Sequence, residues 1–243
     1  MIQSPIKIIV GLCLFSLLSC ATYPYNYYLG QINALNKNNK VIAIAPFGFS
    51  TRKDYIATKY ELTFEKMIDS VLTQAGYSVI KTDKTMPIAA SVRNSLGGLF
   101  DPNSGNIDTI KKKQAYIRFT DSLKKDFAIS GVLYPTIIYV TATVNNGIAW
   151  HGRHIPYFGF ANIHGYITCL SLYVKINDSE GNMIFENAGG IEPIQRINAL
   201  GDLDNIPSDQ LLTNTDNYHA AVGIVFNPLI QQLKKLSGAG IVH

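Results

Sequence analysis

The chain has 243 residues, of which 47% are hydrophobic and 16% charged, and its formal net charge is +4. This charge is too mildly basic to indicate a nucleic-acid-binding protein, so no nucleic-acid partner is expected. The length allows a buried hydrophobic core that needs no disulfide support.

The amino terminus has the pattern of a secretory signal. Lys7 precedes an apolar or small stretch over residues 8–18, and Ser19 stands directly before Cys20. A charged end, a short apolar core and a small residue at the cut are typical of such a signal. The apolar stretch is about half of the ~20 residues needed to cross the hydrocarbon of a bilayer. The sequence therefore predicts a leader over residues 1–19 rather than a permanent transmembrane anchor.

Cys20 completes a short motif at the predicted cleavage point. Leu17-Leu18-Ser19-Cys20 resembles the lipobox of bacterial lipoproteins. The resemblance implies cleavage after Ser19, diacylglycerol on the Cys20 sulfur and a fatty acyl chain such as palmitate on the new amine. One acyl chain holds a protein to a membrane only weakly, and stable anchoring needs a second. Two or three acyl chains on Cys20 would meet this requirement. By the sorting rule of enteric bacteria, Ala21 in place of aspartate implies the periplasmic face of the outer membrane. The alternative is an ordinary signal peptide with a cysteine near the cut by chance.

Residues 20–40 are expected to form a lipidated tether, which leaves residues 41–243 as a single α/β periplasmic domain. Tyrosines crowd the start of this tether and asparagines its end. Tyrosine suits a membrane–water interface, but the rings could equally pack on the surface of the domain. Fully extended, the tether reaches roughly 65–70 Å, so the domain is expected to stay near the membrane. The tyrosines are Tyr23, Tyr25, Tyr27 and Tyr28.

The first part of the domain has the pattern of a βαβ unit. The apolar run 41–45, which Pro46 and Gly48 end, predicts a buried strand. Residues 54–75 carry apolar side chains at three- and four-residue spacing, which predicts a helix that stops at Gly76. Residues 77–80 predict a second strand, parallel to the first.

The middle of the chain predicts one more helix and a long strand. Residues 83–106, rich in proline and glycine, are expected to be irregular. A helix is predicted over 107–125, where the many lysines indicate mainly a solvated face. The alternating and β-branched stretch 128–144 predicts a strand.

The carboxyl-terminal half gives the strongest hairpin signal. Residues 163–176 and 183–191 predict antiparallel strands joined by a polar turn. A loop is expected over 198–216, followed by a helix over 216–236 that Pro228 should kink or interrupt. The fold class that follows is α/β, with a single mixed sheet, a βαβ start, a carboxyl-terminal-half antiparallel hairpin and about three packed helices.

Two stretches of the predicted domain resemble a module of bacterial envelope lipoproteins. One is Val41-Ile42-Ala43-Ile44-Ala45-Pro46-Phe47 with a helix ending in Ala75-Gly76-Tyr77-Ser78-Val79-Ile80. The other is the strand 170–176, its turn, Met183-Ile184-Phe185 and Gly189-Gly190. The pattern is similar to the α/β module of the TolB amino-terminal domain, the curli-export lipoprotein and the lipoprotein activators of peptidoglycan synthases. The resemblance implies a fold and a scaffold or accessory role in an envelope complex. These motifs are structural, so no functional residue is carried over.

Candidate catalytic and calcium-binding residues have simpler structural interpretations. Cys169 stands in an alternating strand pattern, which favours a buried inert thiol. The stretch 101–112 begins like a calcium loop, but Asn106 replaces its glycine and Lys112 its final glutamate. A turn is favoured, with Asn106 or Asp108 capping the next helix. The chain lacks the phosphate-binding loops and the nucleophile elbow of common enzymes, so no enzymatic activity is predicted.

The segment 150–164 holds the only tryptophan and three of the five histidines. His151, His154 and His164 are weak candidates for binding a metal or a small ligand, which is the alternative function. No acidic residue accompanies them between 145 and 177, so no metal is assigned. The covalent lipid on Cys20 is the only cofactor expected.

The preferred interpretation of this segment is a surface that contacts a partner. Trp150, Arg153, Tyr157 and Phe158 are of the types that dominate binding hot spots. The nearby glycines and Pro156 favour a projecting loop over a strand. The alternative is that the aromatic side chains cover an open edge of the sheet. The function predicted overall is a membrane-anchored, non-enzymatic lipoprotein with an envelope protein partner, whose edge strands leave room for a homo-oligomer.

Overall fold

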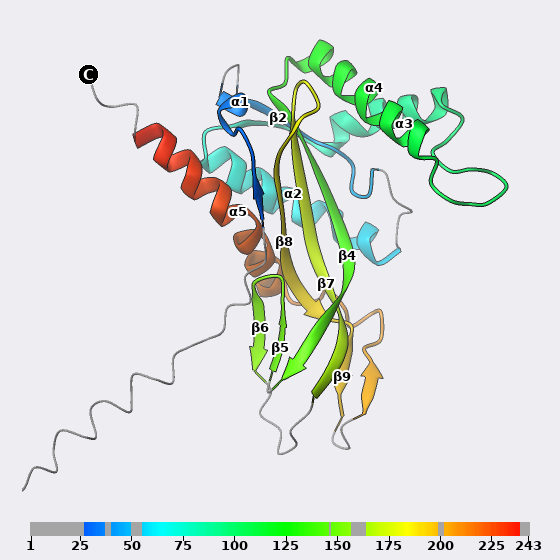
Figure 1. Cartoon of the computed structure of the whole chain (residues 1–243), viewed down its shortest axis with the longest axis vertical. Coiled ribbons are helices and arrows are strands. Elements are labelled where there is room, and N and C mark those ends of the chain that lie inside the picture. The colour runs from blue at the N-terminus through cyan, green and yellow to red at the C-terminus, as the bar shows by residue number, and fades with distance from the viewer. Residues whose placement is uncertain are drawn as a thin grey trace, which may run out of the picture.

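One mixed sheet organises the computed structural model, which describes residues 27–36, 40–49, 55–145, 147–156, 164–198 and 202–238 (Figure 1). The strand order is β1-β8-β7-β4-β2-β3, and β5 and β6 extend the sheet from β4. A separate two-stranded sheet holds β9 and β10. The strands are β1 (Tyr28–Leu29), β2 (Val41–Ile44), β3 (Ser78–Ile80), β4 (Gly131–Asn145), β5 (Gly147–Trp150), β6 (Arg153–Pro156), β7 (His164–Asp178), β8 (Met183–Pro193), β9 (Gln195–Ile197) and β10 (Leu203–Asn205).

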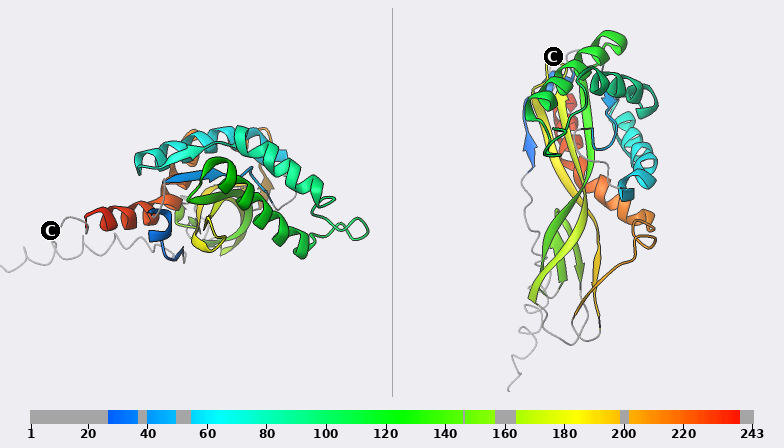
Figure 2. Two further views of the ribbon diagram at one scale, coloured as in Figure 1. Left: turned by 90° about the horizontal axis from the view of Figure 1, so that it is seen from above. Right: turned by 90° about the vertical axis from the view of Figure 1, so that its right-hand side faces the viewer.

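Helices cover both faces of the upper part of the sheet (Figure 2). They are α1 (Asn33–Asn36), α2 (Tyr55–Gln74), α3 (Thr82–Ser95), α4 (Thr109–Phe127) and α5 (Thr215–Gly238). One cluster of buried side chains joins α2 and α5 to the sheet, and a second joins α3 and α4 to it. None of the described helices is long and apolar enough to cross a membrane.

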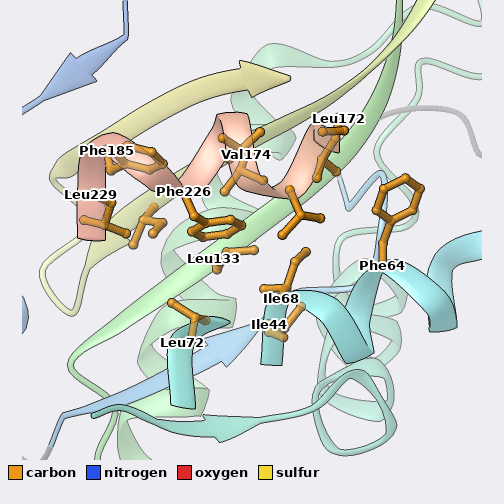
Figure 3. Close-up of a cluster of buried hydrophobic side chains, with 14 of the residues drawn as sticks. Ile44, Phe64, Ile68, Leu72, Leu133, Leu172, Val174, Phe185, Phe226 and Leu229 are labelled. Atoms are coloured by element: carbon orange, nitrogen blue, oxygen red, sulfur yellow. The ribbon is translucent and has the colours of Figure 1, made fainter. Parts of the chain in front are cut away.

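The predicted fold class is confirmed. Strand β2 pairs parallel with β3 after α2, which completes the βαβ start, and it pairs parallel with β4 on its other side. Strands β7 and β8 form the predicted antiparallel hairpin. Apolar side chains of α2 and α5 pack beneath this hairpin (Figure 3). The rings of Phe185 and Phe226 are stacked there, with their centroids 6.4 Å apart.

One helix prediction was wrong, and another was wrong in one of its two alternatives. The stretch 83–106 is not irregular throughout, because α3 occupies its first half and contains Pro87. Thr85 helps to hold this helix, since its buried hydroxyl donates to the Ile44 carbonyl at 2.6 Å. Helix α5 continues through Pro228, so the predicted interruption does not occur. The amide of Asn187 on β8 donates to the Ile224 carbonyl at 3.2 Å, the group that proline leaves without its helical donor.

The folded part begins earlier than the predicted boundary at residue 41. Strand β1 pairs antiparallel with β8, and Ile32 and Leu35 are buried in the core beside α1. Residues 28–36 of the expected tether therefore belong to the domain, because Ile32 and Leu35 pack into the hydrophobic core. Tyr27 and Tyr28 are about half exposed, and Tyr23 and Tyr25 lie outside the described residues.

Strands β4 and β7 pair along their whole length, from Gly131 opposite Asp178 to Asn145 opposite His164, and run past the helices as a long extension (Figure 1). The β5–β6 hairpin curls back from its tip, and the Gly190 N–H of β8 donates to the His151 carbonyl in the hairpin turn at 3.1 Å. The loop predicted over residues 150–160 is thus a strand pair up to Pro156. Its turn is made by His151 and Gly152, both with positive φ.

Candidate functional site

A cleft of about 510 Å³ lies between α4 and the turn that joins β7 to β8. It is at the end of the domain opposite to the tip of the β4–β7 extension (Figure 1). Its walls are polar with a few apolar side chains. The lining residues are Thr109, Lys112, Lys113, Tyr116, Ile117, Thr120 and Asp121 of α4, Lys175 and Asn177 of β7, and Ser179, Glu180, Gly181 and Asn182 of the turn.

Short-range hydrogen bonds fix both walls of the cleft. Asp108 caps α4, accepting from the N–H groups of Ile110 and Lys111 at 3.0 Å each. In the β7–β8 turn, the Asp178 carboxylate accepts from the N–H groups of Glu180 and Asn182 at 2.9 and 2.8 Å. The backbone that carries the polar lining is therefore held in place without a ligand.

The stretch that begins like a calcium loop is a turn, as predicted. Asp101 uses one carboxylate oxygen to accept from the N–H groups of Asn103 and Ser104 at 2.9 and 2.7 Å. These hydrogen bonds hold the pKa of Asp101 below its usual value. Asp108, rather than Asn106, caps the following helix.

Positive charge gathers at the cleft. Lys112, Lys113 and Lys175 line it, and the Lys175 ammonium lies 5.8 Å from the ring centroid of Tyr116. Two acidic residues, Asp121 and Glu180, line it as well, and Glu180 pairs with Lys124 at 2.5 Å. The lysines still outnumber the acidic side chains, so the cleft favours a group that carries negative charge.

Asn177 lines the cleft with a side chain that is nearly buried. Its side chain is 6% exposed, and its buried Oδ1 has no hydrogen-bond partner. A buried amide oxygen usually has a donor, because leaving it unpaired costs about 1–3 kcal/mol. This oxygen has almost no accessible surface, so it belongs to the packed wall of the cleft. The lysines, which do line the cleft, suit it to a molecule that carries a negative charge.

The structure buries one residue of the predicted partner surface and leaves another half-buried. Trp150 is 5% exposed, and its indole N–H donates to the Leu170 carbonyl at 3.1 Å. Arg153 is half-buried and donates to Asn217 of α5 at 2.6 Å. Trp150 thus covers the sheet itself, which was the alternative, and the prediction that Trp150 forms an exposed contact was wrong, whereas the contact at Arg153 stays a prediction. Tyr157 and Phe158 lie outside the described residues.

The three histidines proposed as metal ligands do not come together. His151 Nδ1 is 2.8 Å from the Ser171 hydroxyl, and burial lowers the pKa of the imidazole. His154 and His164 are exposed on β6 and β7, which β5 and β4 separate, and three strand spacings amount to about 14 Å. The described residues include no group of three or more side chains that could hold a metal ion.

Of the two cysteines outside the predicted leader, the structure describes Cys169 but not Cys20. Cys169 is fully buried in β7, as predicted, and burial raises the pKa of its thiol to about 12. Such a thiol is almost entirely protonated at neutral pH, which is unfavourable for a nucleophile. Cys20 lies outside the described residues, so its lipidation stays a prediction.

The sequence contains the cleft residues but gives no signal that joins them. The three consecutive lysines 111–113 indicate a solvated helix face, and Asn177 looks like an ordinary turn residue. The two stretches are more than sixty residues apart, and only the tertiary structure brings them together. No known family model matches the chain, and no curated protein matches it.

Proposed function

We propose that this protein is a lipid-anchored, non-enzymatic accessory subunit of a cell-envelope complex, and that the cleft beside α4 binds its partner. The observation that carries the proposal is the cleft in which Lys112, Lys113 and Lys175 outnumber the acidic side chains. The partner presents a negatively charged group there. A natural candidate is an acidic segment of another envelope protein.

The anchor is supported by the sequence at residues 17–20 and by the position of β1. The short motif before Cys20 is of the lipoprotein type, and Tyr28 of β1 follows it by only eight residues. Periplasmic localisation at the outer membrane is part of the same proposal.

Cell fractionation tests the anchor. The Cys20→Ser variant should leave the membrane fraction, because it has no thiol to accept diacylglycerol. Its melting temperature should equal that of the wild-type domain, since the substitution changes no residue of the described fold. Retention of the variant in the membrane fraction would contradict the lipid anchor.

Photo-crosslinking in cells tests the cleft. A photoreactive amino acid at Ile117, which lines the cleft and is 53% exposed, should give a discrete covalent adduct. The matched control is Leu62 on α2, which is 61% exposed and lies outside the cleft. Adding Lys175→Glu should weaken the Ile117 adduct, because it reverses one charge at the site without altering a buried apolar contact. Equal adducts at both positions, or none at Ile117, would refute binding in the cleft.

A further inference from the structure

The β4–β7 extension has one exposed face on which polar and aromatic side chains gather. We call it the convex face and define it by Tyr139, Thr141 and Thr143 of β4, His154 of β6, and His164 and Tyr166 of β7. The cross-strand register aligns these strands, with Thr143 opposite both Tyr166 and Ala149, and Ala149 opposite His154. Tyr166 is 72% and Tyr139 45% exposed, so both rings meet solvent.

The convex face carries no formal charge. Between residues 135 and 174 the sequence has a single charged residue, Arg153, which turns away from this face to Asn217. The β9–β10 hairpin, which carries Arg196, Asp202 and Asp204, adjoins β7 at Thr168, whose N–H donates to Gln195, so these charges border the face but are not among its residues. The opposite side of the strands is closed by a buried cluster that includes Ala142, Ile148, Trp150 and Ile167. Tyrosine and threonine without fixed charges are well suited to the headgroup region of a bilayer, where an apolar ring and a polar handle are both solvated.

The direction of β1 shows that the chain before it comes from the side of the domain where the β4–β7 extension has its tip. Strand β1 is antiparallel to β8, and β8 runs from the β7–β8 turn toward the tip of the extension. The chain therefore enters β1 from the side of the tip, and its residues before Tyr28 are joined to the domain there.

The chain between Cys20 and β1 is nearly as long as the extension of β7 beyond the level of β1. Glu186 lies opposite both Tyr28 and Lys175, so Lys175 marks the level of β1 on β7. From there to His164 the strand covers eleven residues, or roughly 36 Å. Cys20 precedes Tyr28 by eight residues, which span at most about 28 Å. A lipid on Cys20 therefore places the bilayer within reach of the extension.

We propose that the convex face rests on the surface of the lipid bilayer that holds Cys20, with the cleft beside α4 directed away from the membrane. This inference rests on the proposed lipid anchor for its biological setting. It adds an orientation, in which the uncharged strands lie at the headgroups and the three lysines of the cleft face a periplasmic partner.

The test uses a chemical anchor, so that its outcome does not depend on acylation by the cell. The chain from residue 20, which keeps every described residue, is coupled through Cys20 to a maleimide lipid in phosphatidylethanolamine and phosphatidylglycerol vesicles with brominated acyl chains. Cys169 is buried and does not compete. Tyr166→Trp places a fluorescent probe on the convex face, and Ile117→Trp places a matched exposed probe at the cleft. Trp150 contributes the same background to both proteins.

The Tyr166→Trp fluorescence should fall by about half, because interfacial segments reach ~5–10 Å into the headgroup and acyl boundary. The Ile117→Trp fluorescence should not change. Adding Thr143→Glu to Tyr166→Trp should restore the signal by placing a charge on the face, and this guards against an effect of the new tryptophan itself. Equal quenching of both probes, no quenching of either, or quenching that Thr143→Glu leaves unchanged would overturn the proposal. Failure of the natural anchor would appear separately, as retention of Cys20→Ser in the membrane fraction.

Discussion

The amide of Asn187 makes a hydrogen bond that Pro228 removes from α5, and its deletion is the sharpest test of how this helix is held. Proline has no N–H, so residue 228 cannot donate to the Ile224 carbonyl four positions earlier. Asn187 Nδ2 donates to that carbonyl at 3.2 Å and to the Val225 carbonyl at 2.9 Å. Asn187→Leu keeps the branched shape of the side chain and removes the donor, together with the Oδ1 that accepts from the Ala188 N–H at 2.9 Å.

The expected cost follows from the two carbonyls. The Ile224 oxygen loses the donor that replaces its helical partner, at about 1–3 kcal/mol, and its partial exposure favours the lower half of that range. The Val225 oxygen can still accept from the helix, so its share is roughly 0.5–1.5 kcal/mol. We expect the free energy of unfolding to fall by about 2–3 kcal/mol, which lowers the melting temperature by roughly 5–10 °C in a domain of this size.

Urea unfolding of four proteins measures this effect as a double-mutant cycle. Pro228→Ala restores an N–H that can reach the Ile224 carbonyl, so Asn187→Leu should cost about 1 kcal/mol less in that background. Asn227→Leu, at an exposed position next to the proline, is the control and should change stability by no more than about 0.5 kcal/mol. A coupling free energy within about 0.3 kcal/mol of zero would show that Asn187 does not compensate for the proline.

Four further predictions concern the fold and its titrating groups. Gly189→Ala should lower stability by about 1–3 kcal/mol in urea unfolding, because its Cβ would lie 2.2 Å from a carbonyl oxygen of α5; Gly165→Ala, with no atom within 4 Å, should not. Asp108→Ala should cost about 1 kcal/mol in the same assay through loss of the α4 cap. In the Cys20→Ser protein, the Cys169 thiol should resist a disulfide reagent until the domain unfolds, since burial raises its pKa to about 12; rapid labelling of the folded domain would argue against this. Burial lowers the pKa of His151, so the unfolded chain binds a proton more readily and stability should be lost as the pH falls through about 6.5; His151→Gln should flatten that part of a stability–pH curve.

Local sequence patterns were sufficient for the elements whose side chains repeat with a clear period. The spacing of apolar residues on α2 predicted that helix, and the alternation along β4 and β7 predicted two strands to within a few residues. The buried position of Cys169 followed from the same alternation. The predictions failed where glycine or proline suggested a break that neighbouring chain segments prevent. Asn187 donates to the Ile224 carbonyl, which Pro228 leaves without its helical donor. The Gly190 N–H at the edge of β8 donates to the His151 carbonyl and so holds the β5–β6 turn.

The sequence by itself determined the α/β class, the βαβ start and the strand alternation, because these depend on residues close together in the chain. The prediction of lipid attachment at Cys20 likewise rests on adjacent residues alone. Only the tertiary structure decided that Trp150 is buried, that the histidines stay apart and that Asn177 meets the lysines of α4. Each of these depends on the pairing of distant segments, which no local period of the chain encodes. The same pairing separates a charged cleft at one end of the domain from an uncharged sheet face at the other.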